Sequence, residues 1–314
     1  MRIGLMAGAT AAAGNGLQAV VDYAKMAEER GFDSIWLANI FGLDAVGVCA
    51  IAGWETSRIE FGTAVTPTYP RHPTALAQQA VTTSVACGGR FTLGIGLSHK
   101  MVIEDMLGMS YDKPAAHMNE YLHVLGPLLK GEAVDYAGEQ YQVKLGLDVP
   151  GSSEVPLIVA ALGPAMLKLA GTWADGTTTW MTGPKTIESH IVPGISSAAQ
   201  EAGRAAPRIV CGLPIVVTND VDAVREQIAK ELTVYGMLPS YRAMLDREGV
   251  AGPADLSIVG DEATVRAEIQ RLRDVGVTDF NAAIMPIGEG SLETTLNLLQ
   301  SELGATESGL SQHV

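Results

Sequence analysis

Gly31-Phe-Asp-Ser-Ile-Trp36 and Gly276-Val-Thr-Asp-Phe-Asn281 are two similar junctions in this sequence. In each, the glycine follows an amphipathic segment, and an apolar segment begins a few residues later. Glycine is common just after a helix because it adopts the left-handed conformation without strain. Each junction therefore predicts a helix that ends at the glycine and a buried strand that follows it. This is the repeating unit of an α/β fold.

The same alternation continues along the whole chain of 314 residues. Apolar segments typical of strands recur between helical patterns, at residues 3–7, 34–38, 59–65, 91–97, 157–161, 177–181, 209–217 and 279–285. No low-complexity linker interrupts the pattern. Eight strand–helix units in one undivided chain predict a single (β/α)8 barrel over residues 1–304. An open, doubly wound sheet is the alternative.

Three segments are longer than a minimal barrel requires. One follows the fourth strand (98–114), and one precedes the fifth (131–154, with a hairpin expected at 134–143). The third, at 235–255, follows the seventh strand and is expected to add a small helix. The first and third follow the carboxyl ends of strands, where barrels carry their chemistry. Residues 305–314 are expected to form a polar tail.

The bulk composition excludes several classes of partner. A net charge of −14 argues against nucleic acid and anionic membranes. The most apolar run, 155–167, is short and contains two prolines, so no transmembrane helix is expected. The chain begins with a strand pattern rather than a leader, and its three cysteines are isolated in apolar surroundings. Both features predict a cytoplasmic protein with reduced cysteines.

Several motifs of other enzyme classes are missing or incomplete. No set of histidines and carboxylates has the spacing of a metal site, so no metal is expected. His117 and His123 fall on different faces of a predicted helix and are interpreted as surface histidines. Gly94-Ile-Gly96 lacks the third glycine of a dinucleotide fingerprint. Ser98 is not in a nucleophile elbow, so hydrolase chemistry is unsupported.

Small residues gather where five of the predicted strands end. They occupy positions 7–8, 64–65, 96–98, 160–163 and 182–183. Small side chains let a flat ligand approach the backbone closely. Leu162-Gly163-Pro164 also opens a helix, and a helix N-terminus suits a phosphate. The alternative is that these residues merely form tight corners between strand and helix.

Several motifs resemble those of the bacterial luciferase-like superfamily. They are His72-Pro73, Ala77-Gln78-Gln79, Gly88-Gly-Arg-Phe91, Leu93-Gly-Ile-Gly96, Ala160-Ala-Leu-Gly-Pro164 and Ala174-Asp-Gly176. The resemblance implies a (β/α)8 barrel that binds FMN or the deazaflavin coenzyme F420. Gly62-Thr-Ala-Val-Thr-Pro-Thr68 is most similar to the F420-dependent branch, and within it to the luciferase-like oxidoreductases of actinobacteria.

The stretch from Gly62 to Pro73, GTAVTPTYPRHP, begins like a buried strand and then carries three prolines. The prolines end the strand and stiffen the loop that follows. In the F420-dependent branch the third strand carries a bulge with a non-proline cis peptide, which the resemblance places at Ala64-Val65. The bulge would press on the cofactor ring, bend it, and leave one face open to hydride transfer.

The resemblance also implies roles for residues at other strand ends. The positions that it assigns to the cofactor are Asn39, Ala64, Val65, Gly96, Leu97, Ser98, Ala161, Leu162, Gly163, Met181 and Thr182. Ile40 and Trp180 fall on the substrate rim. Arg71 and Lys100 are candidates to meet the anionic tail of the cofactor, or are solvated surface charges.

One departure from the family pattern concerns catalysis. The sugar-phosphate and alcohol dehydrogenases of this branch carry a catalytic histidine where this chain has Ile40, and an acidic partner where it has His99. A sugar-phosphate dehydrogenase is therefore not expected. His99 is interpreted as a proton donor, because imidazole titrates near neutrality. The alternative is an ordinary loop histidine.

The leading hypothesis is an oxidoreductase that transfers a hydride between F420 and a small organic substrate, in the reductase direction. One alternative is an FMN-dependent monooxygenase that uses reduced flavin and O₂. Another is a flavin-binding barrel without catalytic activity. The resemblance further implies a homodimer.

Overall fold

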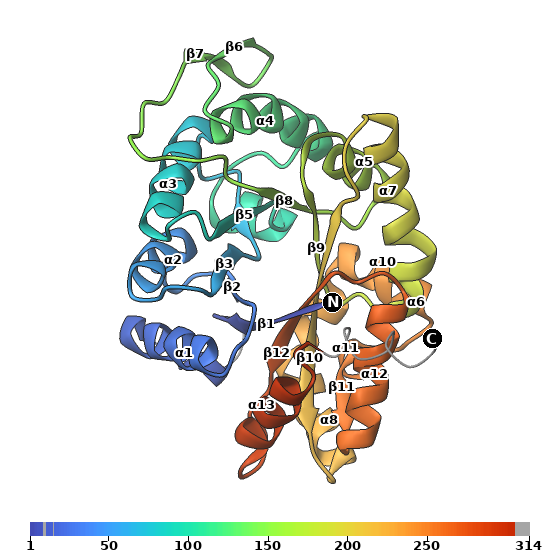
Figure 1. Cartoon of the computed structure of the whole chain (residues 1–314). Helices are drawn as coiled ribbons and strands as arrows, with labels where there is room; N and C mark the ends of the chain where they lie inside the picture. The colour runs from blue at the N-terminus through green and yellow to red at the C-terminus, as the bar shows by residue number, and fades with distance from the viewer. Residues whose placement is uncertain (9–10, 15, 305–314) are drawn as a thin grey trace, which may run out of the picture.

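Eight parallel strands form a closed barrel in the computed structural model, which describes residues 1–8, 11–14 and 16–304 (Figure 1). They are β1 Arg2–Ala7, β2 Ser34–Leu37, β3 Glu60–Thr63, β5 Phe91–Gly96, β8 Leu157–Ala160, β9 Gly176–Trp180, β10 Arg208–Val217 and β12 Asp279–Ile284. Each pairs with the next in this order, and β12 pairs with β1. The predicted barrel and its strands are confirmed. The predicted tail, 305–314, lies outside the described residues.

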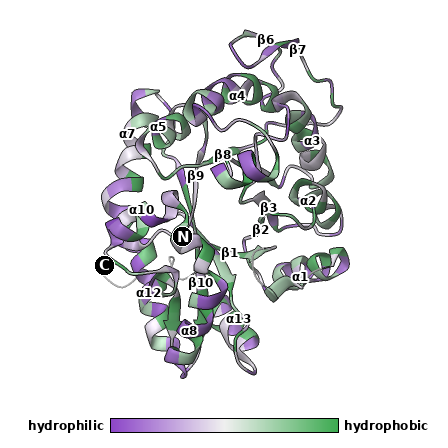
Figure 2. Cartoon of the chain, turned by 180° about the vertical axis from the view of Figure 1, so that it is seen from behind, coloured by the Kyte–Doolittle hydropathy of each residue, from purple (hydrophilic) through white to green (hydrophobic). Residues whose placement is uncertain are grey.

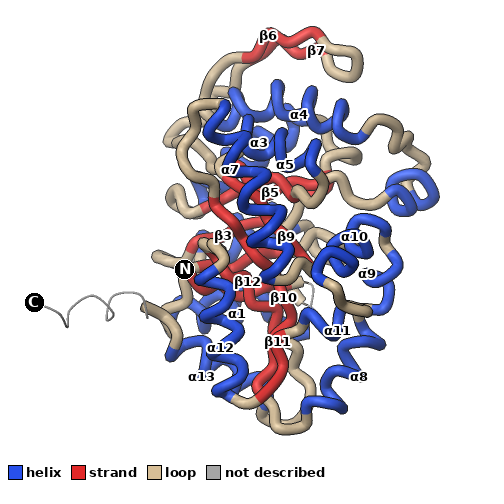
Figure 3. The backbone as a smooth tube through the Cα atoms, turned by 90° about the vertical axis from the view of Figure 1, so that its right-hand side faces the viewer, coloured by secondary structure: helices blue, strands red, loops and turns tan. Residues whose placement is uncertain are grey.

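Helices surround the strands (Figures 1 and 3). The main ones are α1 Leu17–Glu29, α2 Ala45–Trp54, α3 Pro73–Ala86, α4 Pro114–Leu129, α5 Pro164–Trp173, α7 Val192–Glu201, α8 Val221–Glu231, α12 Glu262–Asp274 and α13 Ser291–Ser301. Gly31 (φ +91°) and Gly276 (φ +94°) follow α1 and α12 in the left-handed conformation, as predicted. Hydrophobic residues line the strands in Figure 2, while hydrophilic residues gather on the outer helices. None of the helices within the described ranges is long and apolar enough to cross a membrane.

Charged side chains close the amino-terminal end of the barrel. Arg208 contacts Asp279 at 2.7 Å and Glu60 at 2.9 Å, and Arg2 contacts Glu60 at 2.6 Å. Next to this network, Trp36, Ile158 and Val210 form a separate buried cluster. The Arg208 guanidinium lies over the Trp36 ring, 5.7 Å from its centre. This end is packed for stability, which leaves the carboxyl-terminal end for a ligand.

The third strand is interrupted at the position that the family resemblance implies, although the residues alone predicted a strand through Val65. The peptide between Ala64 and Val65 is cis, and a short strand, β4 (Thr66–Pro67), then resumes pairing with β5. The Thr63 hydroxyl donates to the Gly94 carbonyl at 2.7 Å and accepts from the Gly94 amide at 3.0 Å. A Cβ atom at Gly94 would lie 1.8 Å from the Thr63 carbonyl oxygen. Glycine is therefore required where β5 passes the interruption.

Each predicted insertion is present. The segment after β5 contains a short π-helix, η2 (Met101–Met106), and β6 (Val134–Ala137) pairs with β7 (Gln142–Leu145) as the expected hairpin. The insertion after β10 holds three helices rather than one: α9 Thr233–Met237, α10 Pro239–Glu248 and α11 Pro253–Leu256. A short strand, β11 (Ile258–Gly260), then pairs with β10 beyond the barrel. β11 was not predicted, because three residues are too few to show periodicity.

His117 corrects one interpretation of the sequence. Its side chain is buried and stacks on the Tyr69 ring, with 4.0 Å between ring centres. The neutral imidazole donates from Nδ1 to Gln140 Oε1 at 2.9 Å and accepts at Nε2 from the Thr68 hydroxyl at 3.0 Å. The surface interpretation is wrong for His117 because the turn between β6 and β7 covers this face of α4.

Glu248 fastens the insertion after β10 to the barrel. Its carboxylate accepts hydrogen bonds from the Lys185 amide, the Thr186 amide and the Thr186 hydroxyl, at 3.1, 2.8 and 2.7 Å. These groups begin the short helix α6 (Pro184–Thr186). We expect Glu248→Ala to lower the free energy of unfolding by about 1–3 kcal/mol, measured by urea denaturation, because three donors lose a charged acceptor.

Glu231→Ala on α8 is the matched control. Its carboxylate accepts one exposed hydrogen bond, from the Gln227 side chain one turn away, so a change within about 0.5 kcal/mol is expected. Equal effects of the two substitutions would contradict the anchoring role of Glu248.

Candidate functional site

A cavity of about 510 Å³ lies at the carboxyl ends of the barrel strands. Ligand pockets are usually about 300–1,000 Å³. The strands and the turns directly after them contribute Met6, Ala38, Asn39, Ala64, Val65, Pro67, Ser98, Ala160, Leu162, Thr178, Thr179 and Trp180. The longer connections contribute Ile40, Phe41, Pro70, Arg71, His99, Met101, Val102, Ile103, Met106, Leu107, Val234, Tyr235, Leu238 and Tyr241. The insertions after β5 and β10 thus both reach the cavity.

The structure brings together part of the set that the sequence analysis assigned to a cofactor and substrate. Among the cavity's lining residues are Asn39, Ile40, Ala64, Val65, Ser98, His99, Leu162 and Trp180. The remaining members do not line it: Gly96, Leu97, Ala161, Gly163, Met181 and Thr182. The side chains of Ala161, Met181 and Thr182 are buried elsewhere. All assigned roles remain predictions.

Gly96 lies behind the cavity wall rather than in it. A Cβ atom at this position would lie 2.5 Å from Val65 Cγ2 and 3.4 Å from Ala160 Cβ. Because Gly96 has no side chain, the Val65 side chain can pack between β5 and the cavity. The small residues at these strand ends serve close packing as well as access for a ligand.

Asn39 is held in place by the helix that follows it. Its Oδ1 accepts a hydrogen bond from the backbone amide of Ala45, the first residue of α2, at 3.0 Å. An Arg71 nitrogen lies 3.5 Å from the same oxygen. With Oδ1 engaged, the donor end of the amide is the part of Asn39 that is available to a ligand.

The two cations that the sequence analysis singled out both have carboxylate partners. Arg71 contacts Asp44 at 2.7 Å, and Lys100 contacts Glu104 at 3.5 Å. Lys100 is exposed and does not line the cavity. Among the described lining residues, Arg71 is the only lysine, arginine, aspartate or glutamate. The cavity is therefore nearly neutral.

His99 belongs to an aromatic group on one side of the cavity. Its ring centre lies 5.5 Å from that of Tyr241, which lies 5.4 Å from Tyr235. Tyr235 in turn lies 6.0 Å from Trp180, whose buried Nε1 has no hydrogen-bond partner among the described residues. Burial lowers the pKa of His99 and raises the pKa of both tyrosines. Near neutral pH all three side chains are therefore uncharged.

Tyr235 and Tyr241 were not predicted as site residues. They lie more than a hundred residues after His99 in the chain, and only the packing of α9 and α10 over the barrel brings them to it. The available signal was a pair of aromatic residues in the segment that follows the seventh strand.

The lowered pKa values of His99 and His117 predict a pH-dependent stability. Burial lowers both from the ordinary value of 6.5, so below about pH 6.5 the unfolded chain binds protons that the folded chain does not. The free energy of unfolding should therefore fall on acidification, by up to about 1.4 kcal/mol per pH unit for each histidine. Urea denaturation between about pH 5 and about pH 7.5 measures it. His117→Gln should reduce this pH dependence, and an unchanged slope would contradict the assignment.

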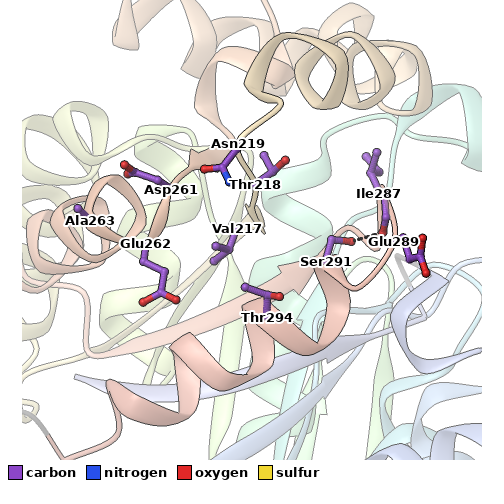
Figure 4. Close-up of a pocket in the computed structure, with 11 residues that line it drawn as sticks. Val217, Thr218, Asn219, Asp261, Glu262, Ala263, Ile287, Glu289, Ser291 and Thr294 are labelled. Carbon is purple, nitrogen blue, oxygen red and sulfur yellow. Dashed lines mark hydrogen bonds between the residues drawn. The ribbon is translucent and has the colours of Figure 1, made fainter.

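A second cavity, of about 530 Å³, lies beyond the ends of β10, β11 and β12 (Figure 4). Asp261, Glu262 and Glu289 make its lining acidic, which disfavours a phosphate or carboxylate ligand. Asp261 caps α12 by accepting the Thr264 amide at 2.9 Å, and the Ser291 hydroxyl donates to the Gly288 carbonyl at 2.9 Å. No metal-binding group of histidine, cysteine or carboxylate side chains occurs in the described ranges. The first cavity is therefore the candidate site.

Comparisons with known proteins agree with this geometry. The family model for luciferase-like monooxygenases matches residues 1–279. A 5,10-methylenetetrahydromethanopterin reductase of Methanolobus tindarius is 27% identical over 313 residues, covering 90% of this chain and 95% of that protein. An F420-dependent glucose-6-phosphate dehydrogenase of Nakamurella multipartita is 28% identical over 276 residues, covering 80% and 77%.

The same relationship appears among solved structures. The coenzyme F420 dependent tetrahydromethanopterin reductase from Methanopyrus kandleri superposes with a TM-score of 0.78 at 26% identity, covering 96% of this chain and 97% of that one. The relatives are archaeal as well as actinobacterial, so the finer resemblance to actinobacterial enzymes remains a prediction. The chain belongs to the luciferase-like monooxygenase family, a family of oxidoreductases.

Proposed function

We propose that this protein is an F420-dependent oxidoreductase that transfers a hydride from the reduced deazaflavin to a small organic acceptor. The observation that carries the proposal is the nearly neutral cavity beside the interrupted third strand. Asn39 lies on its wall, as does the indole N–H of Trp180, which has no hydrogen-bond partner among the described residues. Two of the relatives reported above support the same cofactor, because both the Nakamurella multipartita dehydrogenase and the Methanopyrus kandleri reductase are named as F420-dependent.

The cavity wall suits a flat, uncharged ring. Ala38, Ala64 and Ala160 are small, and Val65 fills the space that the glycine at position 96 leaves behind the wall. A ring that lies on this surface would meet the amide donor of Asn39 at its edge. When bound, the deazaflavin supplies the hydride, and the residues of this chain bind it, orient it and exclude water.

The N-terminus of α5 is a candidate binding site for the phosphate of the cofactor. Its first turn is exposed, and no side chain of the described residues caps it. Free backbone amides and the helix dipole favour an anion at such a position. The neighbouring helix α6 does not offer an equal site, because Glu248 already occupies its first amides.

The protein offers few positive charges to the anionic tail of the cofactor. The chain has a net charge of −14, and Arg71 and Lys100 are already paired with carboxylates. The affinity for F420 should therefore weaken markedly as salt is removed, because screening of the surrounding acidic surface is lost.

The groups near the cavity support transfer in the reductase direction. The family resemblance places Ile40 at the position of the catalytic histidine of the alcohol-oxidising relatives, and isoleucine at that position cannot remove a hydroxyl proton. Reduction instead requires a proton donor, and His99 lies on the cavity wall for that role.

Anaerobic calorimetric titration with oxidised F420 and with FMN tests the proposal. We expect tighter binding of F420. Ala165→Glu adds a carboxylate to the exposed first turn of α5 and should weaken binding at least about tenfold through charge repulsion. Ala116→Glu, in the first turn of α4 and away from the cavity, is the matched control and should have no effect. Equal or tighter binding of FMN would instead favour the monooxygenase alternative.

A further inference from the structure

Large apolar side chains gather at the mouth of the cavity. Ile40, Phe41, Met101, Met106, Leu107 and Val234 are between 45% and 66% exposed, and all six line the cavity. They come from three separate connections: the loop after β2, the segment around η2, and α9. Apolar surface from separate segments around one opening marks a binding site for apolar ligands, whereas exposed apolar residues scattered singly do not.

The charges around this opening give an independent indication. Arg71 is the only acidic or strongly basic residue among the described lining residues, and Asp44 already neutralises it at 2.7 Å. A phosphate or carboxylate on the substrate would lose its hydration without gaining a free cation, which is costly. A substrate ammonium group would find no carboxylate in the same lining.

A small number of polar atoms remains for a neutral polar group. The hydroxyls of Tyr235 and Tyr241 make no hydrogen bond to another described side chain or backbone group, and His99 lies beside Tyr241. Tyr241 and His99 thus offer two neutral hydrogen-bond donors on one side of an otherwise apolar cavity, and such a pair suits a single carbonyl oxygen.

On the basis of the proposed function, we propose that the substrate is an uncharged, mainly apolar molecule with a carbon–carbon double bond conjugated to a carbonyl group. Its apolar body lies against Phe41, Met101 and Met106, and its carbonyl oxygen faces His99 and Tyr241. Reduced F420, when bound, would supply the hydride for the new C–H bond at the β carbon, and His99 or water would supply the proton for the α carbon. The double bond is reduced by two electrons, and F420 is oxidised by two.

A matched pair of probes tests this substrate class. They are 4-phenylbut-3-en-2-one and its derivative with a carboxylate at the para position of the ring. Binding is measured by calorimetry, both to the protein without cofactor and to its complex with oxidised F420. We expect the neutral probe to bind at least about tenfold more tightly than the carboxylate in both forms. Equal binding, or tighter binding of the carboxylate, would overturn the inference.

Three variants locate the interaction. Phe41→Ser should weaken binding of the neutral probe by about three- to tenfold, since a large apolar side chain is lost from the mouth. Leu145→Ser, on β7 and also exposed, lies outside the lining and should change nothing. Met106→Lys adds a free cation and should reduce or reverse the preference for the neutral probe. An unaltered preference in Met106→Lys would contradict binding at this mouth.

The outcomes separate this inference from the proposed function. If the protein prefers FMN but still binds the neutral probe more tightly, the cofactor assignment is wrong and the substrate class stands. If F420 binds and the carboxylate probe is preferred, the substrate class is wrong and the cofactor assignment stands.

Discussion

His99→Ala is expected to lower turnover by about 10²–10⁴, the usual contribution of a general acid, while cofactor affinity stays almost unchanged. His99 lies on the cavity wall beside Tyr241, with 5.5 Å between the ring centres. It does not anchor any helix or strand through a side-chain hydrogen bond that the structure describes. Single-turnover oxidation of the bound reduced cofactor, followed by absorbance, measures the effect.

The pH dependence distinguishes a proton donor from a residue that only shapes the cavity. A general acid must be protonated, and burial lowers the pKa of His99 below the ordinary value of 6.5. The wild-type rate should therefore fall as pH rises, with its midpoint below about pH 6.5, and the alanine variant should lose this dependence. Lys100→Ala, a neighbouring exposed residue paired with Glu104, is the control. A wild-type rate in His99→Ala on the acidic side of about pH 6.5, where a protonated His99 would act, would show that the proton comes from water.

Gly94→Ala is expected to destabilise the barrel by about 3 kcal/mol or more and to abolish cofactor binding. The added Cβ would lie 1.8 Å from the Thr63 carbonyl oxygen and 3.0 Å from the Thr63 carbonyl carbon. These are backbone atoms of a strand that is paired on both sides, so they cannot move aside as the end of a flexible side chain would. Urea denaturation measures the loss of stability, and calorimetry measures cofactor binding.

Gly126→Ala provides the matched control, because this glycine lies inside α4 and an added Cβ meets nothing within 4 Å. Pro127 follows directly, which offsets the usual gain from alanine in a helix interior, so a change within about 1 kcal/mol is expected. Wild-type stability of Gly94→Ala would show that β3 and β5 are not as close as the structure places them.

The strands of the barrel could be predicted because local sequence determines them. Apolar segments such as 91–97 stand between glycines and helical patterns, so their positions are visible without any knowledge of tertiary contacts. The interruption after Thr63 was not visible in this way, because the residues alone predicted a strand over 59–65 and only the family resemblance implied a bulge at Ala64-Val65; prolines 67, 70 and 73 marked the loop that follows. The structure places the interruption between β3 and β4.

The remainder of the site depends on contacts between distant parts of the chain. Tyr235 and Tyr241 reach the cavity from α9 and α10, and Glu248 fastens α10 to α6. His117 is buried because the turn with Gln140 folds over α4. The pairing of Arg71 with Asp44, which removes a free cation from the cavity mouth, is likewise invisible in either local segment.

Anaerobic single-turnover mixing tests the central claim most directly. The protein with bound reduced F420 is mixed with 4-phenylbut-3-en-2-one in the absence of oxygen, and the absorbance of oxidised F420 is followed. We expect oxidised F420 and the saturated ketone to form in equal amounts. Absence of both products, together with oxygen-dependent product formation when reduced FMN is supplied instead, would contradict the account.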